Sequence, residues 1–147
     1  MEELMKITGK VRIELFDEKG NKKDERYNSN LVVTAGKNYL AAWLIAATQS
    51  NYFMRYVALG EGTNPAAIGD TTLQSPLATR VAGALTSSLN VWQNIASFGP
   101  GVDTGAITEA GLFSASTSGT LFARQVFSVI NKAAGDTLAI TWQITLS

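Results

Sequence analysis

The chain has 147 residues, no cysteine and no histidine, and its twelve Lys and Arg balance twelve Asp and Glu, so the formal net charge is zero. Disulfides, zinc sites built on thiolate or imidazole, cysteine nucleophiles and Ser-His-Asp relays are therefore excluded. No amino-terminal signal peptide is expected, because the first residues are charged. The sequence has no run of about twenty apolar residues and no basic patch, which argues against a membrane span and against nucleic-acid binding through phosphate contacts.

Charge is concentrated near the amino terminus. Residues 1–26 hold seven Lys or Arg and seven Asp or Glu, which leaves ten charged residues for the remaining 121. Polar uncharged side chains could keep this part of the chain, residues 27–147, in solution. Alternatively, much of its surface faces other protein, because the cores of interfaces lose charge and near-zero net charge favours association. We favour the second interpretation.

The first thirty residues are expected to form a charged arm and hairpin. Residues 6–16 alternate apolar and polar side chains, as a half-exposed strand does. Residues 17–21 (DEKGN) predict a tight turn, since Gly20 and Asn21 tolerate positive φ. Residues 22–30 return as a charged strand. Its carboxylates lack the spacing of a calcium loop, so a solvated turn is favoured over a cation site.

One helix is expected. Residues 31–34 (LVVT) predict a short buried strand, and Thr34 is a candidate N-cap. Apolar residues then recur at helical spacing, which predicts an amphipathic helix over residues 35–48. Within it, Trp43 is interpreted as a core residue rather than as a platform for a ligand.

The middle of the chain predicts further strands over residues 54–60, 78–85 and 89–98, and a short helical turn at 70–73. The glycine-containing stretch after residue 60 matches no phosphate-binding motif, and a long loop is favoured there.

The carboxyl-terminal part predicts a three-stranded meander over residues 105–113, 121–130 and 138–146. In the first strand Ile107, Glu109, Gly111 and Phe113 are expected on one face. The last strand has the clearest alternation, with a core face made by Leu138, Ile140, Trp142, Ile144 and Leu146. Together these elements predict one mainly β domain over residues 1–147, an antiparallel β-sandwich of seven or eight strands with a single helix.

Candidate functional residues are few. Glu109 and Arg124 lie on adjacent predicted strands and are expected to oppose each other as a structural ion pair. A catalytic carboxylate with an anion clamp is the alternative, but no second carboxylate lies nearby in sequence. Scattered aromatics (Trp92, Trp142, Tyr52, Phe53 and Tyr56) are interpreted as core or interface residues rather than as a sugar-stacking surface. No catalytic, cofactor or metal site is predicted, and no enzyme activity is expected.

From residue 31 onward the chain resembles the small β-sandwich virion proteins of tailed bacteriophages, a group that includes capsid decoration (cement) proteins and tail-associated or fibre-associated proteins. The resemblance is carried by residues 30–36 (NLVVTAG), 56–65 (YVALGEGTNP), 70–73 (DTTL) leading to Arg80, 107–113 (ITEAGLF) and 136–147 (DTLAITWQITLS). No single stretch is specific, and residues 1–30 depart from the pattern.

The resemblance implies a non-enzymatic structural protein of the virion, assembled in the host cytoplasm, that binds the head shell as a homo-oligomer, often a trimer. Its partners would be copies of itself and the major capsid protein or another virion protein. The candidate interface is the charged hairpin, with Arg12, Glu14, Lys22, Lys23, Arg26 and Tyr27. A tail, adaptor or fibre-associated protein remains open, as does a carbohydrate-binding module that uses loops 60–69 or 99–105.

Overall fold

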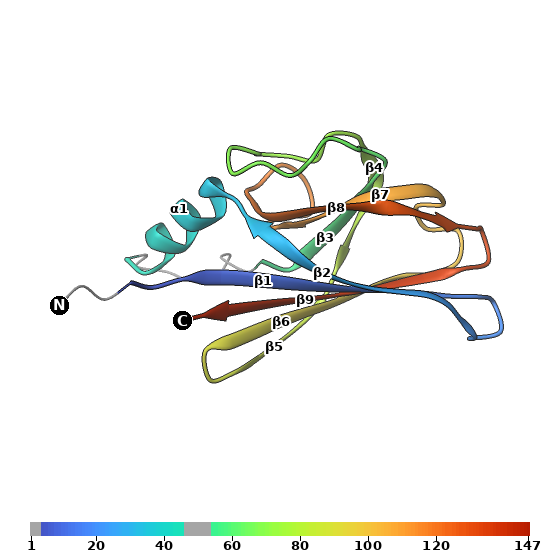
Figure 1. Ribbon diagram of the computed structural model, residues 1–147, viewed down its shortest axis with the longest axis horizontal. Helices are drawn as coiled ribbons and strands as arrows, with labels where there is room; N and C mark the ends of the chain where they lie inside the picture. Colours follow the sequence, from blue (N-terminus) through green and yellow to red (C-terminus); the bar gives the residue numbers. More distant parts are fainter. Residues whose placement is uncertain (1–3, 46–53) are drawn as a thin grey trace.

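The computed structural model describes residues 4–45 and 54–147, in which nine antiparallel strands form one sheet in the order β4-β3-β7-β8-β2-β1-β9-β6-β5 (Figure 1). The strands are β1 (Ile7–Phe16), β2 (Lys22–Val32), β3 (Tyr56–Gly60), β4 (Pro76–Ala82), β5 (Ala84–Ser88), β6 (Val91–Phe98), β7 (Gly105–Phe113), β8 (Leu121–Lys132) and β9 (Thr137–Leu146). The mainly β class is confirmed. A sandwich of two separate sheets is not, because β2 pairs with both β1 and β8 and the sheet curls into a nearly closed barrel.

The two edges of the curled sheet meet at a corner between β4 and β5. The sequence predicts a single strand over residues 78–85, but the chain bends at Gly83, which raises the number of strands to nine among the described residues. Asn94 of β6 is fully buried at this corner, and its side-chain amide donates to the carbonyls of Met54 and Arg55 at 2.9 and 2.8 Å. A Cβ at position 83 would lie 1.8 Å from Asn94 Oδ1, so this bend requires glycine.

The main core lies inside the barrel. The alternation predicted for the last strand is confirmed, because Leu138, Ile140, Trp142 and Ile144 of β9 have no exposed surface. β1 runs between β2 and β9 and sends Val11, Ile13 and Leu15 into the same core. The charged hairpin is therefore built on one of the central strands of the sheet.

A second layer covers the outer side of β3, β7 and β8. The loop of residues 61–75 lies there, and its Leu73 packs with Ala58, Phe113 and Leu121 in a separate buried cluster. The helical turn predicted at residues 70–73 is absent, since the chain makes a turn at 68–69 and then continues without helix. Leu73 needs this extended path to reach the sheet.

The helix α1 (Thr34–Trp43) begins one residue earlier than predicted and is regular as far as Trp43, while positions 46–48 lie outside the described residues. Thr34 is not the N-cap. Val33 occupies that position in an extended conformation, and no side chain caps the helix. The cap is unnecessary for the Thr34 amide, because this N–H donates to the carbonyl of Ile68 at 2.8 Å.

The two ends of the barrel differ. Figure 1 places the start of β1, the carboxyl terminus, α1 and the β5–β6 turn at one end, and the β1–β2 turn at the opposite end. Lys6 and Ser147 exchange two backbone hydrogen bonds, and Asn90 of the β5–β6 turn bonds to Leu146. These bonds hold the first of the two ends together.

Candidate functional site

Glu109 and Arg124 form a buried ion pair beneath the loop of residues 61–75. Arg124 Nε and Nη2 lie 3.0 and 2.9 Å from Glu109 Oε2, and the residues are 2% and 0% exposed. The expected register is wrong, however. Glu109 lies opposite Val126, and Arg124 lies opposite Gly111, because the β7–β8 pairing is irregular at two points. The pair is therefore diagonal.

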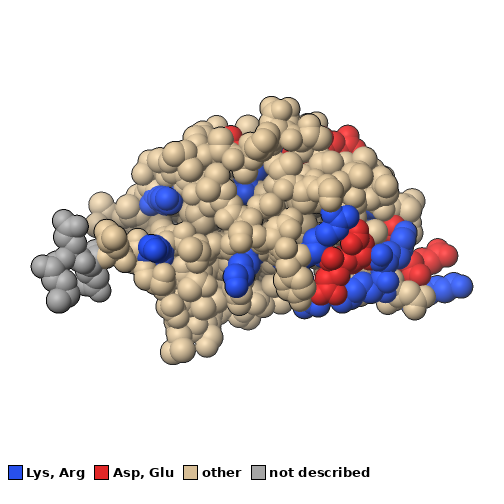
Figure 2. Space-filling model, viewed as in Figure 1, with Lys and Arg blue, Asp and Glu red and all other residues tan. Residues whose placement is uncertain are grey.

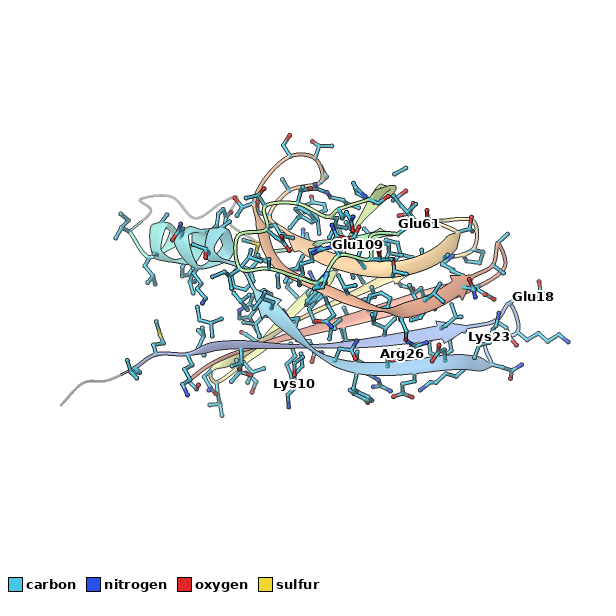
Figure 3. The ribbon with its side chains drawn as sticks, turned by 45° about the horizontal axis from the view of Figure 1, so that its top comes forward. Lys10, Glu18, Lys23, Arg26, Glu61 and Glu109 are labelled. Carbon is cyan, nitrogen blue, oxygen red and sulfur yellow. The ribbon has the colours of Figure 1, made fainter. Side chains whose placement is uncertain are left out.

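This pair fixes the loop to the sheet. The Glu109 carboxylate accepts from the backbone N–H groups of Gly62, Gln74 and Ser75 at 3.0, 3.1 and 2.7 Å. Arg124 reaches the Asp70 carboxylate at 2.9 Å. Figure 3 shows Glu109 inside the fold rather than at a surface. A carboxylate with these donors and no exposed surface lacks the access that a substrate would need, so the contacts support a structural role.

The glycines of the GEG sequence (Gly60 and Gly62) allow this arrangement. A Cβ at either position would lie 2.5 Å from Glu109 Oε1. The carboxylate therefore occupies the space that their side chains would take.

Surface ion pairs join several of the candidate interface residues of the charged hairpin. On the outer face of β1 and β2, Arg12 lies 3.0 Å from Glu14 and 3.1 Å from Glu25, and Lys22 lies 2.9 Å from Glu14 and 2.7 Å from Glu25. These contacts raise the pKa of Lys22, and the contact with Lys22 lowers the pKa of Glu25. We call this four-residue set the charge ladder.

The other three candidate interface residues lie apart from the charge ladder or at its edge. Lys23 pairs with Asp136 at 2.8 Å. Arg26 pairs with Asp24 and also donates to the backbone carbonyls of Ser128 and Val129, across the part of the sheet where β2 and β8 are not paired. Tyr27 is 68% exposed, and the Arg12 guanidinium lies over its ring, 5.4 Å from the ring centroid. Their part in an interface stays a prediction.

An apolar groove lies at the end of the barrel that carries the carboxyl terminus. It has a volume of about 490 Å³ and lies between α1 and the β5–β6 hairpin. Its walls include Tyr39, Leu40, Trp43, Leu85, Trp92 and Leu146. Around it, five large apolar side chains are exposed, namely those of Leu4, Met5, Leu44, Ile45 and Leu89. We call the groove and these five residues the apolar end.

The expectation for one aromatic residue, Trp43, changes at this end. Trp43 is not a core residue, because it is half-exposed on the wall of the groove. Trp92 also lines the groove and meets Phe122 edge to face, with ring centroids 5.6 Å apart. Trp142 is fully buried, and Tyr56 packs against the separate outer cluster. The described aromatics thus share no single stacking face; Tyr52 and Phe53 lie outside the described residues.

Outside the hairpin, the surface carries even less charge than the sequence indicates. Of the ten charged residues after Arg26, only Lys37, Arg55 and Glu61 are exposed. Glu109, Arg124, Lys132 and Asp136 are buried, and Asp70, Arg80 and Asp103 are half-buried. Figure 2 accordingly shows mixed blue and red side chains gathered at the β1–β2 end and a largely uncharged surface elsewhere on this face.

Sequence reasoning missed the groove because it assigned the apolar residues of the helix to the core. A signal was present, since Trp43, Leu44 and Ile45 are consecutive and one face of a helix cannot bury all three. In residues 4–45 and 54–147, no group of three or more acidic side chains that could hold a metal ion was found. Within the same ranges, no helix has the length and apolar character to cross a membrane.

Comparison of the chain with protein-family models, with curated proteins and with solved structures gave no match.

Proposed function

We propose that the protein is a non-enzymatic structural protein of a tailed-bacteriophage virion, a decoration protein that binds the head shell as a homo-oligomer and stabilises it. The resemblance of residues 31–147 to such proteins suggests this class. The observation that carries the proposal is the surface of the body, on which only three of the ten charged residues after Arg26 are exposed.

That surface suits a protein that is pressed against other protein. Charged side chains are depleted in the centre of interfaces, because each must be desolvated when the partners meet. A protein that binds a symmetric shell also multiplies many weak contacts by symmetry, and it needs rigid neutral faces more than a reactive group. The groove and the exposed apolar side chains around it add a surface of the kind that marks interaction sites.

The test is binding to undecorated heads. Purified protein is mixed with the heads, and bound protein is measured after sedimentation, with stoichiometric binding as the expected result. Replacing Tyr27, the most exposed member of the candidate interface, by alanine should weaken binding. Val129→Ala serves as the control, since Val129 is a partly exposed apolar residue of β8 outside that set. Failure of the wild-type protein to bind heads would overturn the proposal.

A position in the tail, as an adaptor or fibre-associated protein, uses the same neutral surfaces. Immunogold labelling of the particle separates the two locations, because decoration places the label over the head. Label confined to the tail would replace decoration by the alternative.

A further inference from the structure

We propose that the groove at the apolar end receives the amino-terminal arm of a second copy of this chain, with Leu4 and Met5 as the inserted residues. This inference rests on the proposed assembly role for its purpose, but its test is made on the purified protein alone.

The described residues of the arm, Leu4 and Met5, are exposed on their own chain. Backbone pairing of the amino-terminal segment ends at Lys6, which bonds to Ser147, and the described residues before it, Leu4 and Met5, belong to no strand. Leu4 and Met5 are 75% and 69% exposed, so neither side chain occupies the groove of its own chain. Two adjacent large apolar side chains on an extended arm are costly in water and gain by burial elsewhere.

The groove has apolar walls and borders an edge strand, as a site for such an arm requires. It is bordered by β5, an edge strand of the sheet whose only partner in the described chain is β6. An edge strand can align an extended segment of another chain. Successive side chains of that segment point to opposite sides, so Met5 would enter the groove while Leu4 packs on exposed apolar side chains such as Leu44 and Ile45, which follow the groove residue Trp43 in the chain.

Charge favours the arm of a second copy over an unrelated apolar partner. Glu2 and Glu3 precede Leu4 in the sequence. The exposed charged residues described near the groove are basic, namely Lys6 at the start of the sheet, Lys37 on α1 and Arg55 beside the groove residue Met54. An acidic arm with an apolar tip thus complements an apolar groove with a basic surround.

Symmetry lets the contact repeat. Each copy has one arm and one groove, so each can give one arm and receive one, and a reciprocal exchange between two copies or around a ring leaves no arm or groove unused.

The first measurement is the molar mass in solution by light scattering. The wild-type protein should give a multiple of the chain mass of 15.7 kDa, and the double variant Leu4→Glu/Met5→Glu should give a single chain mass. Val129→Glu, a control at an exposed apolar position of β8, should keep the wild-type mass. A wild-type protein of one chain mass, or a double variant that keeps the multiple, overturns the inference.

The second measurement is a crosslink, which the absence of cysteine makes clean. A tagged Met5→Cys variant is mixed with an untagged Ser87→Cys variant, whose cysteine lies on the β5 wall of the groove, and oxidised gently. A disulfide-linked species of one tagged and one untagged chain is expected. A matched mixture with Val129→Cys should give at least tenfold less of it, and equal yields in the two mixtures contradict arm exchange. Because no heads are present, an assembled protein that fails to bind heads would reject the proposed function alone.

Discussion

At the scale of single residues, Glu109 explains why the longest loop of the described fold is held in place. Its carboxylate is the shared acceptor for three loop amides and for Arg124, in a region from which water is excluded. A buried ion pair contributes little over an apolar pair of the same shape, but loss of one partner leaves the other charge without compensation. The loop should therefore depend strongly on this one side chain.

Glu109→Gln is expected to lower the free energy of unfolding by about 3–5 kcal/mol. It keeps the size of the side chain, but it leaves the Arg124 guanidinium without its buried counter-charge and turns an amide group toward backbone donors. Urea unfolding followed by tryptophan fluorescence measures the change. Glu25→Gln, in the exposed charge ladder, is the control and should change stability far less. Equal losses in the two variants would show that burial is not the cause.

Gly83→Ala tests the corner that closes the barrel. The new Cβ would overlap Asn94 Oδ1 and displace the side chain that satisfies the Met54 and Arg55 carbonyls. A loss of about 1–3 kcal/mol in the free energy of unfolding is expected, since buried polar groups lose their partners. Gly69→Ala, where a Cβ meets no atom within 4 Å, should be close to neutral. The prediction fails if Gly83→Ala unfolds at the same urea concentration as the wild-type protein.

Asp136 predicts part of the response to acid. Hydrogen bonds from Lys23 and from the Ala133 amide lower the pKa of Asp136 below its ordinary value of 3.8. The stability that these hydrogen bonds contribute to the folded state is present above about pH 4. It is lost as the pH falls through the lowered pKa of Asp136 in the folded protein. Asp136→Asn should therefore be less stable at pH 7 and lose less stability on acidification than the wild-type protein. Urea titrations across that range measure both, and parallel pH profiles would contradict it.

At the scale of elements, β1 joins the two halves of the chain. It pairs along its length with β9 from the carboxyl-terminal meander and with β2 from the charged hairpin. Its inner face is core, and its outer face carries Arg12 and Glu14 of the charge ladder. The hairpin and the barrel are consequently inseparable.

Two truncations distinguish the arm from the hairpin. Removal of residues 1–5 ends before β1 and should keep a cooperative unfolding transition, because every strand of the barrel is retained. Removal of residues 1–26 takes away β1 and its core residues Val11, Ile13 and Leu15, and should abolish cooperative unfolding. Circular dichroism during heating reads both. A cooperative transition in the longer truncation would mean that β1 is dispensable.

The sequence predicted the strands better than the contacts between them. The bounds of β7 were predicted correctly at residues 105–113. The expected face is wrong only at Ile107, which packs in the main core with Ala110 and Leu112, whereas Glu109, Gly111 and Phe113 share the outer face. Thr108 and Glu109, though consecutive, both bond to Gly62 of the loop. An irregularity in the pairing with β8 breaks the alternation here, and periodicity within one strand carries no information about it.

The candidate sites were predictable to a similar extent. Glu109 and Arg124 could be paired from their strands alone, whereas Asp70 could not, because its contact depends on the path of a long loop. The groove was missed for the same reason. Its walls come from the helix α1 and from the four strands β5, β6, β8 and β9, which the sequence alone does not bring together. Hydropathy does not distinguish a helix face that is buried in the core from one that lines a groove.

At the scale of the whole molecule, the charged and apolar surfaces lie at opposite ends. The charge ladder is neutralised within the chain, while the apolar end exposes the large side chains of Leu4, Met5, Leu44, Ile45 and Leu89. With the two surfaces separated in this way, the apolar end could bind other copies of the chain, while the charged end could contact a different protein. Assembly and attachment to a shell would then use separate parts of the protein.

The hydrogen bonds between Lys6 and Ser147 place the start of the sheet beside the carboxyl terminus, and this permits a circular permutation of the chain. A circular permutant that joins the termini through a short glycine-serine linker and opens at the exposed turn near Thr117 should keep the cooperative thermal transition of the parent. The permutant would contain every strand and the groove, but it would have no free amino-terminal arm. Monomeric behaviour of a folded permutant would thus assign self-association to the arm without altering a single side chain of the barrel.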